Sequence, residues 1–519
     1  MGPLQDGQQE ALDAEFRPTG LLRSAAFPHA VSDLELRETT LAWVILTGGF
    51  AYKIKKTVAL SFVDQSTLAK RKALCDEELR LNRRWAGDLY DSVVPITSDA
   101  DGLRVGGSGA TVEFAVKMRQ FAAEQELSVL LERGAIDAPV IRAFAVRLAD
   151  FHRHLSPAPR AAGSPGTARL HDTVLGTLAT FLCHLDRETQ APELGALVDW
   201  THDFLHDSLF LLCKRQHTGH IRECHGDLHA RNIVYWEGKL VPFDSLEFDP
   251  ALRWIDVISD VAFLFMDLIG HRRTDLAFDF LNAYLLRSGD YDGVRLLRFY
   301  AVYRALVRAM VDELAAEGQP KSRDEFLARG RRRLNTAIDL LEARNPRLII
   351  MHGLSGSGKS FLSARLAEEL GAVLVRSDVE RKRIQQQTGA EEIHTPQFDE
   401  RIYAHVLSCA EACLQGGISV IVDAAFLEAR HRQMFRSWAK LHNAPFLIVS
   451  CGADLSVLES RIERRRQLGI DPSDADLVEL RRQVRSFVPL DEAESDCLVK
   501  VDTMSQEAVT AAVVRVRDR

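Results

Sequence analysis

Leu348-Ile-Ile-Met-His-Gly353-Leu-Ser-Gly-Ser-Gly358-Lys359-Ser360 joins an apolar run to the pattern Gly-x-x-x-x-Gly-Lys-Ser. A short apolar run that enters such a loop predicts a buried parallel strand, and Phe361 to Leu370 is expected to form the helix that follows. The glycines allow successive backbone N–H groups and the helix N-terminus to point at one phosphate chain. This segment is therefore expected to bind ATP or another nucleoside triphosphate.

The predicted nucleotide-binding residues of this loop lie almost side by side in the sequence. They are Gly353, Ser355, Gly356, Ser357, Gly358, Lys359 and Ser360. Lys359 is expected to reach the β- and γ-phosphates and to act in catalysis, and Ser360 is expected to ligate Mg²⁺. The simpler interpretation is a turn rich in glycine and serine, which leaves the flanking strand and helix unexplained.

Length and composition indicate an ordinary globular protein of several domains. The chain has 519 residues, 46% of them hydrophobic and 27% charged, so two or three domains are expected. A net charge of −8 argues against broad nucleic-acid binding. Eight scattered cysteines without a CxxC pair suit neither a disulfide framework nor a zinc site. No signal-peptide pattern or membrane-length apolar run is found, so we expect a cytoplasmic protein that does not bind membranes.

The first part of the chain predicts a small antiparallel sheet. Residues 1–25 are polar and are expected to be a flexible N-terminus. Leu41 to Leu46 and Phe50 to Lys55 are predicted to be two strands joined by a tight turn. Lys53 and Lys55 share one face of the second strand. A lysine in a half-buried strand needs a partner or a function, although both could simply reach solvent at a sheet edge.

A helix is predicted to follow this sheet, from Ser66 to Trp85, with Ser66 as its N-cap. Glu78 flanks the apolar stripe of this helix. It is therefore expected to face the sheet and to pair with Lys53, with Glu77 as the alternative. Further on, Ala122 to Leu155 is predicted to be helical.

A second group of polar residues lies in His225-Gly-Asp227-Leu-His-Ala-Arg-Asn232, which is followed by a predicted hairpin that ends at Asp244. The hairpin is expected to place Asp227, Asn232 and Asp244 around one point. Phosphoryl transfer to a hydroxyl needs a carboxylate that orients the nucleophile, and oxygen ligands for Mg²⁺. Asp227 is predicted to be the catalytic carboxylate, and Asn232 and Asp244 the metal ligands. His225 is expected to support the loop by hydrogen bonding. The simpler alternative is a surface turn rich in Asp and Asn.

The pattern His-Gly-Asp-x-x-x-x-Asn, followed by a strand that ends in aspartate, resembles the aminoglycoside phosphotransferase family, a branch of the protein-kinase-like fold. The resemblance covers roughly residues 25 to 340. It implies that Lys53 binds ATP, that Glu78 supports Lys53, and that Asp256 or Asp260 braces the catalytic loop. The glycine-rich loop of such kinases would here be Glu38-Thr39-Thr40, which has no glycine. A pseudokinase that binds nucleotide without turnover is therefore an alternative.

Strands and helices alternate after residue 346, which predicts a parallel sheet with helices on both faces. Asp378 and Asp423 follow two of the predicted strands, at the edge of the sheet where the phosphate loop lies. Asp378 suits a base that faces the acceptor hydroxyl, and Asp423 suits a ligand of Mg²⁺ through water. A helix N-cap is the simpler role for either aspartate.

A basic helix is predicted around Leu458 to Arg466. Arg461 and Arg465 stand at i, i+4 and are expected to fold over the transferring phosphate and stabilise its charge. The alternative is a solvated basic face paired with Glu459 and Glu463. The phosphate loop, Ser-Asp-x-x-Arg and Leu-x-x-Arg-x-x-x-Arg together resemble the small P-loop kinases, among them gluconate kinase, the polynucleotide 5′-kinase domain and the zeta toxins. This resemblance implies a kinase and specifies the acceptor only weakly.

Together these patterns predict an α/β and α+β multidomain chain. A bilobal protein-kinase-like domain (26–343, with an N-lobe at about 26–121 and a C-lobe at about 122–343) precedes a P-loop NTPase domain with a parallel sheet (346–519). The two halves resemble the bacterial bifunctional aminoglycoside phosphotransferase/ATP-binding proteins. That resemblance implies two ATP- and Mg²⁺-dependent phosphotransferases that act on a hydroxyl of a small molecule or of a nucleic-acid end. The alternative is an N-terminal nucleotide sensor that regulates the P-loop kinase.

Overall fold

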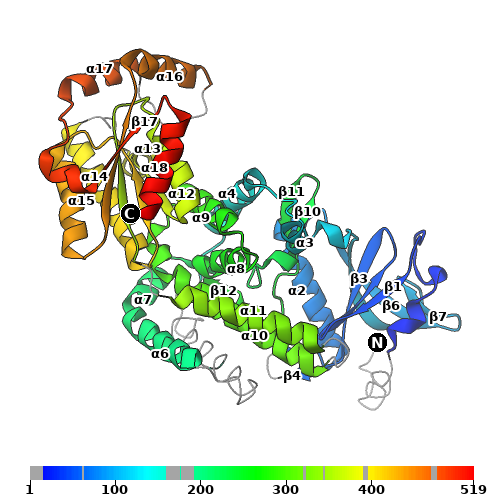
Figure 1. Cartoon of the computed structure of the whole chain (residues 1–519). Helices are drawn as coiled ribbons and strands as arrows, with labels where there is room; N and C mark the ends of the chain where they lie inside the picture. Colours follow the sequence, from blue (N-terminus) through cyan, green and yellow to red (C-terminus); the bar gives the residue numbers. More distant parts are fainter. Residues whose placement is uncertain are drawn as a thin grey trace.

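The computed structural model describes residues 16–60, 63–158, 176, 192–318, 323–342, 345–389, 395–468 and 476–519. Figure 1 shows the N-lobe sheet at one end of the molecule, the P-loop unit at the other, and the helical C-lobe between them. Within the described residues, no helix has both the length and the apolar composition that a membrane span requires.

The N-lobe is a six-stranded antiparallel sheet covered by one helix. The strand order is β1-β2-β3-β8-β6-β7. The strands are β1 (Glu35–Glu38), β2 (Ala42–Leu46), β3 (Phe50–Lys55), β6 (Tyr90–Asp99), β7 (Gly102–Val105) and β8 (Ala110–Arg119), with a separate small pair β4 (Ala59–Leu60) and β5 (Val63–Asp64). Helix α2 (Leu68–Ala86) packs on β6 and β8, which places one of its faces over β3.

The C-lobe is mostly helical. Its helices are α3 (Leu127–Glu132), α4 (Ala138–His154), α6 (Pro192–Asp207), α7 (Leu209–His217), α8 (Val257–Gly270), α9 (Thr274–Ser288), α10 (Val294–Gly318) and α11 (Arg323–Leu341). Short strands and 3-10 turns carry the polar motif: β9 (Ile221–Glu223), η5 (Ala230–Asn232), β10 (Ile233–Trp236), β11 (Lys239–Pro242), η6 (Pro250–Leu252), β12 (Trp254–Asp256) and η7 (Tyr291–Gly293). The predicted hairpin is confirmed, because β10 pairs antiparallel with β11.

The C-terminal unit is a five-stranded parallel sheet in the order β14-β15-β13-β16-β17. Its elements are β13 (Leu348–His352), α12 (Lys359–Leu370), β14 (Val373–Arg376), α13 (Ser377–Thr388), α14 (Pro396–Gln415), β15 (Val420–Asp423), α15 (Ala429–Leu441), β16 (Phe446–Gly452), α16 (Leu455–Leu468), α17 (Leu477–Ser486), η9 (Glu492–Cys497), β17 (Leu498–Asp502) and α18 (Gln506–Asp518). Every residue of β13 is buried, since this strand is central and helices cover both faces of the sheet. The phosphate loop therefore starts at the middle of the sheet, where the strand order reverses.

One apolar cluster runs without interruption from the C-lobe into the P-loop unit. It contains Phe278 and Leu297 of the C-lobe together with Val373 and Val406 of the P-loop unit. Helix α9 contacts β14 and α12, and α10 contacts α14. The two units therefore share a core, whereas the sequence predicted two domains, 26–343 and 346–519. Residues 343 and 344, at the predicted boundary, lie outside the described residues.

Three local predictions differ from the structure. Residues 1–25 were expected to be flexible, but Leu21 is fully buried in the N-lobe core; residues 1–15 lie outside the described part. Thr67, rather than Ser66, caps α2, because its hydroxyl accepts the N–H of Lys70. The predicted helix Ala122–Leu155 is divided between α3 and α4, because Gly134 takes a left-handed conformation (φ 63°) between them.

Candidate active sites

In the N-lobe, Lys53 is held between two carboxylates that come from different parts of the chain. Its Nζ lies 2.9 Å from Oε1 of Glu78 and 2.5 Å from Oδ1 of Asp244. Glu78 is fully buried and reaches β3 from α2. The predicted pair is thus present, and the alternative Glu77 instead binds Arg80.

A second lysine extends this ion-pair network. Lys55 contacts the other oxygen of Glu78 and also Glu247. Lys55 is 1% exposed and Glu247 is 7% exposed. Because water is largely excluded there, each of the two charges is stabilised mainly by its ion-pair partners. The spacing of Lys53 and Lys55 on one strand face pointed to Lys55, but no pattern in the sequence pointed to Glu247.

The charges in this network set the ionisation of its members. Burial acts to raise the pKa of Glu78, but Lys53 and Lys55 outweigh it and lower that pKa to about 2. Burial acts to lower the pKa of Lys53, but Asp244 and Glu78 raise it well above its usual value. Lys53 and Glu78 are therefore both charged at neutral pH.

The second group of residues centres on Asp227. Nδ2 of Asn232 donates to Oδ2 of Asp227 at 2.9 Å and to its backbone oxygen at 3.0 Å. The amide oxygen of Asn232 is therefore the atom available to a metal ion. His229, which the sequence reasoning did not single out, lies with Nε2 3.3 Å from Oδ2 of Asp227. Burial would raise the pKa of Asp227, but the charges of His229 and Arg308 hold it well below its usual range.

His225 links Asp227 to the strand that ends in Asp244. Its Nδ1 accepts the N–H of Asp227 at 3.3 Å, and its Nε2 donates to the backbone oxygen of Phe243 at 3.0 Å. This hydrogen bonding agrees with the supporting role predicted for His225. Asp244 has a left-handed backbone (φ 61°), uncommon for a residue other than glycine, and its N–H donates to the hydroxyl of Tyr90.

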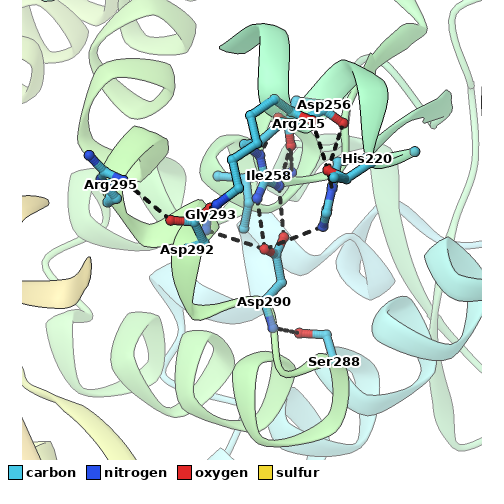
Figure 2. A network of polar contacts seen from close by, with 12 residues as sticks. Arg215, His220, Asp256, Ile258, Ser288, Asp290, Asp292, Gly293 and Arg295 are labelled. Atoms are coloured by element: carbon cyan, nitrogen blue, oxygen red, sulfur yellow. Dashed lines mark hydrogen bonds and ion pairs between the residues drawn. The ribbon is translucent and has the colours of Figure 1, made fainter. Parts of the chain in front are cut away.

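Of the two aspartates that could brace the catalytic loop, Asp260 takes this position. Its carboxylate accepts the N–H groups of His225 (2.9 Å) and Gly226 (3.0 Å). Figure 2 shows that Asp256 instead points toward Arg215, which also binds Asp290. Asp256 therefore ties helices of the C-lobe together away from the loop.

The turn between β1 and β2 replaces the glycine-rich loop of other kinase-like folds. The hydroxyl of Thr39 donates to the backbone oxygen of Ala42 and accepts its N–H, at 2.9 and 3.0 Å. This hydroxyl is therefore used to close the turn.

The phosphate loop of the P-loop unit has the backbone that its glycines predict. Gly353, Gly356 and Gly358 all have positive φ angles, of 137°, 81° and 85°. A Cβ atom on Gly356 would lie 2.8 Å from the backbone oxygen of Leu458, so the loop also needs a residue without a side chain there. Among the described residues, the buried hydroxyl of Ser357 has no hydrogen-bond partner.

Lys359 lies inside this loop, where Nζ donates to the backbone oxygens of Gly353 and Leu354, each at 2.9 Å. Burial lowers the pKa of Lys359, and the charges of Asp423 and Asp378 oppose that effect. Both predicted carboxylates are therefore close enough to Lys359 to influence it. Asp378 occupies the first turn of α13, whose N-cap residue is Arg376.

Asp423 ends β15 and is 6% exposed. Burial raises its pKa, and Arg376, Lys359 and the hydroxyl of Ser360 act against that rise. A buried carboxylate beside a serine hydroxyl offers the oxygen donors that Mg²⁺ prefers, so Ser360 and Asp423 fit the metal that was predicted here. Asn232 and Asp244 offer the same kind of donor in the other site.

Arg461 and Arg465 differ in their surroundings. Arg461 donates to the backbone oxygen of Gly356 at 3.2 Å and to Oγ1 of Thr503 at 2.9 Å, so it supports the phosphate loop. Arg465 acts electrostatically on Lys359, and its predicted role at the transferring phosphate stays a prediction. Sequence reasoning missed Thr503, which also donates to Ser357 O, and Gln483, which accepts the N–H of Ser355. Both come from distant elements without a recognisable motif.

Comparisons with known proteins found a family for the C-terminal unit and relatives that cover most of the chain. Residues 348–490 match the protein family described as an AAA domain. The uncharacterized proteins Rv2004c of Mycobacterium tuberculosis and Mb2027c of Mycobacterium bovis are each 31% identical to the chain over 454 residues, which is 84% of this chain and 88% of theirs.

Two solved structures are similar to parts of the chain. A gluconokinase from Sinorhizobium meliloti is 21% identical, with 34% of this chain and 95% of that chain covered and a TM-score of 0.26. A choline/ethanolamine kinase family protein from Mesorhizobium loti is 13% identical, with 61% of this chain and 96% of that chain covered and a TM-score of 0.33.

Proposed function

The chain belongs to the same family as these uncharacterized mycobacterial proteins, and we propose that it is a tandem phosphotransferase with two separate nucleotide sites. Each site would transfer the γ-phosphoryl group of ATP to a hydroxyl of a small molecule or of a nucleic-acid end. The P-loop unit and the kinase-like topology support a phosphotransferase in general. The acceptors and the activity of each half are part of the proposal.

The observation that carries this proposal is a chain of contacts around Asp227. Asn232 binds Asp227, His225 joins Asp227 to the strand that ends in Asp244, and Asp244 reaches Lys53 of the other lobe. A turn on the protein surface would not need this arrangement. In the proposed reaction, Lys53 binds the phosphates, and Asn232 and Asp244 would hold Mg²⁺, which neutralises phosphate charge when bound. Asp227 accepts the proton of the acceptor hydroxyl.

In the P-loop unit, the loop amides and Lys359 would bind the triphosphate, and Ser360 and Asp423 would hold Mg²⁺. Asp378, in the first turn of α13, would orient the acceptor hydroxyl. Arg461 keeps the loop in shape through its bonds to Gly356 and Thr503.

The test uses the full-length chain, because the two units share a core. Transfer from γ-labelled ATP is screened against sugars, amino alcohols and 5′-hydroxyl oligonucleotides for the parent, Asp227→Ala, Lys359→Ala and the double variant. Each single variant is expected to lose one set of acceptors and keep the other, and the double variant to lose both. Full transfer by both single variants to every acceptor would contradict the proposal.

One observation favours a second candidate function, in which the kinase-like half senses nucleotide and regulates the P-loop half. The turn Glu38-Thr39-Thr40 lacks glycine, and the hydroxyl of Thr39 is used within the turn. Under this alternative, Asp227→Ala leaves transfer to every acceptor in place, while Lys359→Ala removes all of it. The same assay therefore separates the two functions.

A further inference from the structure

The edge of the P-loop sheet is completed by a side chain of the kinase-like unit. Strand β14 is one of the two edge strands of this sheet, the other being β17. Nδ2 of Asn282, on α9, donates to the backbone oxygen of Ala372 at 3.0 Å, and its Oδ1 accepts the N–H of Leu374 at 2.7 Å. The intervening Val373 donates in the other direction, to Ser419 before β15. One amide thus makes the two hydrogen bonds that a further strand would make.

Other contacts fix the position of this amide relative to the strand. The hydroxyl of Tyr291 donates to the backbone oxygen of Leu374 at 3.4 Å. A Cβ on Gly371 would lie 2.9 Å from the ring of Phe278, so the chain approaches α9 closely just before β14. The register between α9 and β14 is therefore well defined at this end of the strand.

A cavity interrupts the packing of β14 against the C-lobe on the side of Asn282. A cavity of about 610 Å³ lies between α9, α12 and β14, and Asn282, Ser360 and Arg376 all line it. Side chains that border a cavity lack packing partners on that side. Beside this cavity, the two hydrogen bonds from Asn282 restrain the outer edge of β14 in addition to the apolar packing of Val373 and Val375.

The C-terminal end of β14 delivers three consecutive residues to the phosphate site. Nε of Arg376 lies 3.3 Å from Oδ2 of Asp423, and the hydroxyl of Ser377 donates to the backbone oxygen of Asp423 at 3.1 Å. Asp378 follows, close enough to Lys359 to affect it electrostatically. Arg376 is only two residues beyond Leu374, about 7 Å along a strand. A shift of β14 at Leu374 therefore moves the groups around Asp423.

We propose that Asn282 is a positioning residue for the P-loop site, holding β14 so that Arg376, Ser377 and Asp378 meet Asp423 and the phosphate loop. The inference rests on the proposed function of that site. It makes the kinase-like unit part of the P-loop site although Asn282 itself does not reach the nucleotide. The phosphate loop follows β13, which is central and fully buried, so the amides that bind phosphate do not depend on Asn282.

The groups beside Asp423 depend on β14, whereas the phosphate loop follows β13, so the proposal predicts different effects on the two. Loss of Asn282 affects the groups beside Asp423 and leaves the phosphate loop in place. The variant Asn282→Leu is therefore expected to keep Mg²⁺-free ATP affinity within about twofold of the parent. The additional affinity that Mg²⁺ provides is expected to fall about tenfold, since two hydrogen bonds to the strand are lost.

The experiment compares the full-length parent, Asn282→Leu and Asn282→Gln, with Asp279→Asn as a matched control. Asp279 lies on the same helix and lines the same cavity, but it binds Arg142 at 2.8 Å. ATP binding is measured by calorimetry with and without Mg²⁺, and binding that disappears in Lys359→Ala is assigned to the P-loop site. Asn282→Gln keeps an amide, and its gain in ATP affinity on addition of Mg²⁺ is expected to lie between those of the parent and Asn282→Leu.

Amide exchange provides a readout that needs neither metal nor acceptor. In Asn282→Leu, peptides spanning 371–383 are expected to exchange at least about tenfold faster, because the N–H of Leu374 loses its partner. Peptides spanning 498–518, on the far side of the sheet, serve as the internal reference and should not change. If Asn282→Leu does not fold, Asn282→Ser supplies the same comparison.

The proposal would be overturned if Asn282→Leu showed the same amide exchange in peptides 371–383 as the parent and the same gain in ATP affinity on addition of Mg²⁺. Equal losses of affinity with and without Mg²⁺, with faster exchange in the reference peptides, would also overturn it, because they indicate general destabilisation. A parent that binds no nucleotide at Lys359 contradicts the proposed function instead. In that case the exchange comparison alone decides whether Asn282 positions β14.

Discussion

The phosphate loop and the kinase-like cleft, the two proposed nucleotide sites, are built in two different ways. The phosphate loop is built from consecutive residues between Gly353 and Ser360, and its binding groups are mostly backbone amides fixed by positive φ angles. The cleft is built from side chains that are far apart in sequence, such as Lys53 and Asp244, separated by 191 residues. A site of the first kind is a local property of the chain, and a site of the second kind depends on the packing of two lobes.

The two sites also differ in the groups that contact their lysine side chains. The cleft holds Lys53 and Lys55 against the buried carboxylate of Glu78, so that removal of a charged partner disturbs a network of buried ion pairs. In the loop, Lys359 is held by backbone oxygens of Gly353 and Leu354, which carry no net charge. We therefore expect mutations in the cleft to affect both stability and activity, and mutations in the loop to affect mainly activity.

The largest expected effect is on catalysis by the loop. Lys359→Ala removes a cation that would stabilise charge in the transition state, and kcat of the P-loop site is expected to fall about 10²- to 10³-fold. Stability is expected to change by less than about 0.5 kcal/mol, because the partners of Lys359 are neutral. Steady-state kinetics and urea unfolding measure the two quantities, with the exposed Lys440→Ala as control. A large loss of stability in Lys359→Ala would break the comparison.

The largest loss of stability is expected from a mutation in the cleft. Glu78→Gln removes the buried carboxylate that Lys53 and Lys55 share, and the lowered pKa of Glu78 corresponds to a cost of about 3 kcal/mol. The control Asp76→Asn, on the same helix, removes an exposed partner of Lys72 and should cost less than about 0.5 kcal/mol. Urea unfolding at neutral pH compares the variants. Equal losses of unfolding free energy in Glu78→Gln and Asp76→Asn would show that the ion pairs of the cleft do not stabilise the fold.

The same glutamate predicts a pH dependence. In the folded protein the pKa of Glu78 is about 2, below its ordinary 4.5, so the unfolded chain binds the proton more tightly. The stabilisation is complete above pH 4.5 and is lost as the pH falls toward 2; it amounts to about 3 kcal/mol. The difference in unfolding free energy between the parent and Glu78→Gln is therefore expected to narrow from pH 6 to pH 3. A constant difference over this range would contradict the assignment.

The smallest effect is expected in the turn that replaces the glycine-rich loop. Thr39→Ala is expected to change nucleotide affinity by less than about twofold, because the hydroxyl of Thr39 only closes the turn. Gly356→Ala is the matched change in the phosphate loop. It places a Cβ 2.8 Å from a backbone oxygen at a positive φ angle, and it should abolish binding at that site. Isothermal calorimetry measures nucleotide binding by Thr39→Ala and Gly356→Ala. It tests whether the phosphate loop depends on its backbone conformation while the turn between β1 and β2 tolerates a change.

Sequence patterns predicted the helix that carries Glu78 but left Glu77 open, because two adjacent residues on a helix differ only by rotation about its axis. Asp256 and Asp260 were similarly ambiguous. Tertiary packing resolved both pairs, since Glu77 turned out to face Arg80 and Asp256 to face Arg215. Glu247, Thr503 and Gln483 lacked any signal, because each acts through one contact with a distant segment.

The sequence by itself determined the parallel sheet, the phosphate loop and the hairpin of Asp227, because apolar periodicity and the conformational needs of glycine act over a few neighbouring residues. Only the tertiary structure decided that Asn282 completes the edge of β14 and that both units share one core. A backbone group at a sheet edge accepts any partner of suitable geometry. Which side chain reaches it depends on the packing of whole helices, and no local pattern encodes that.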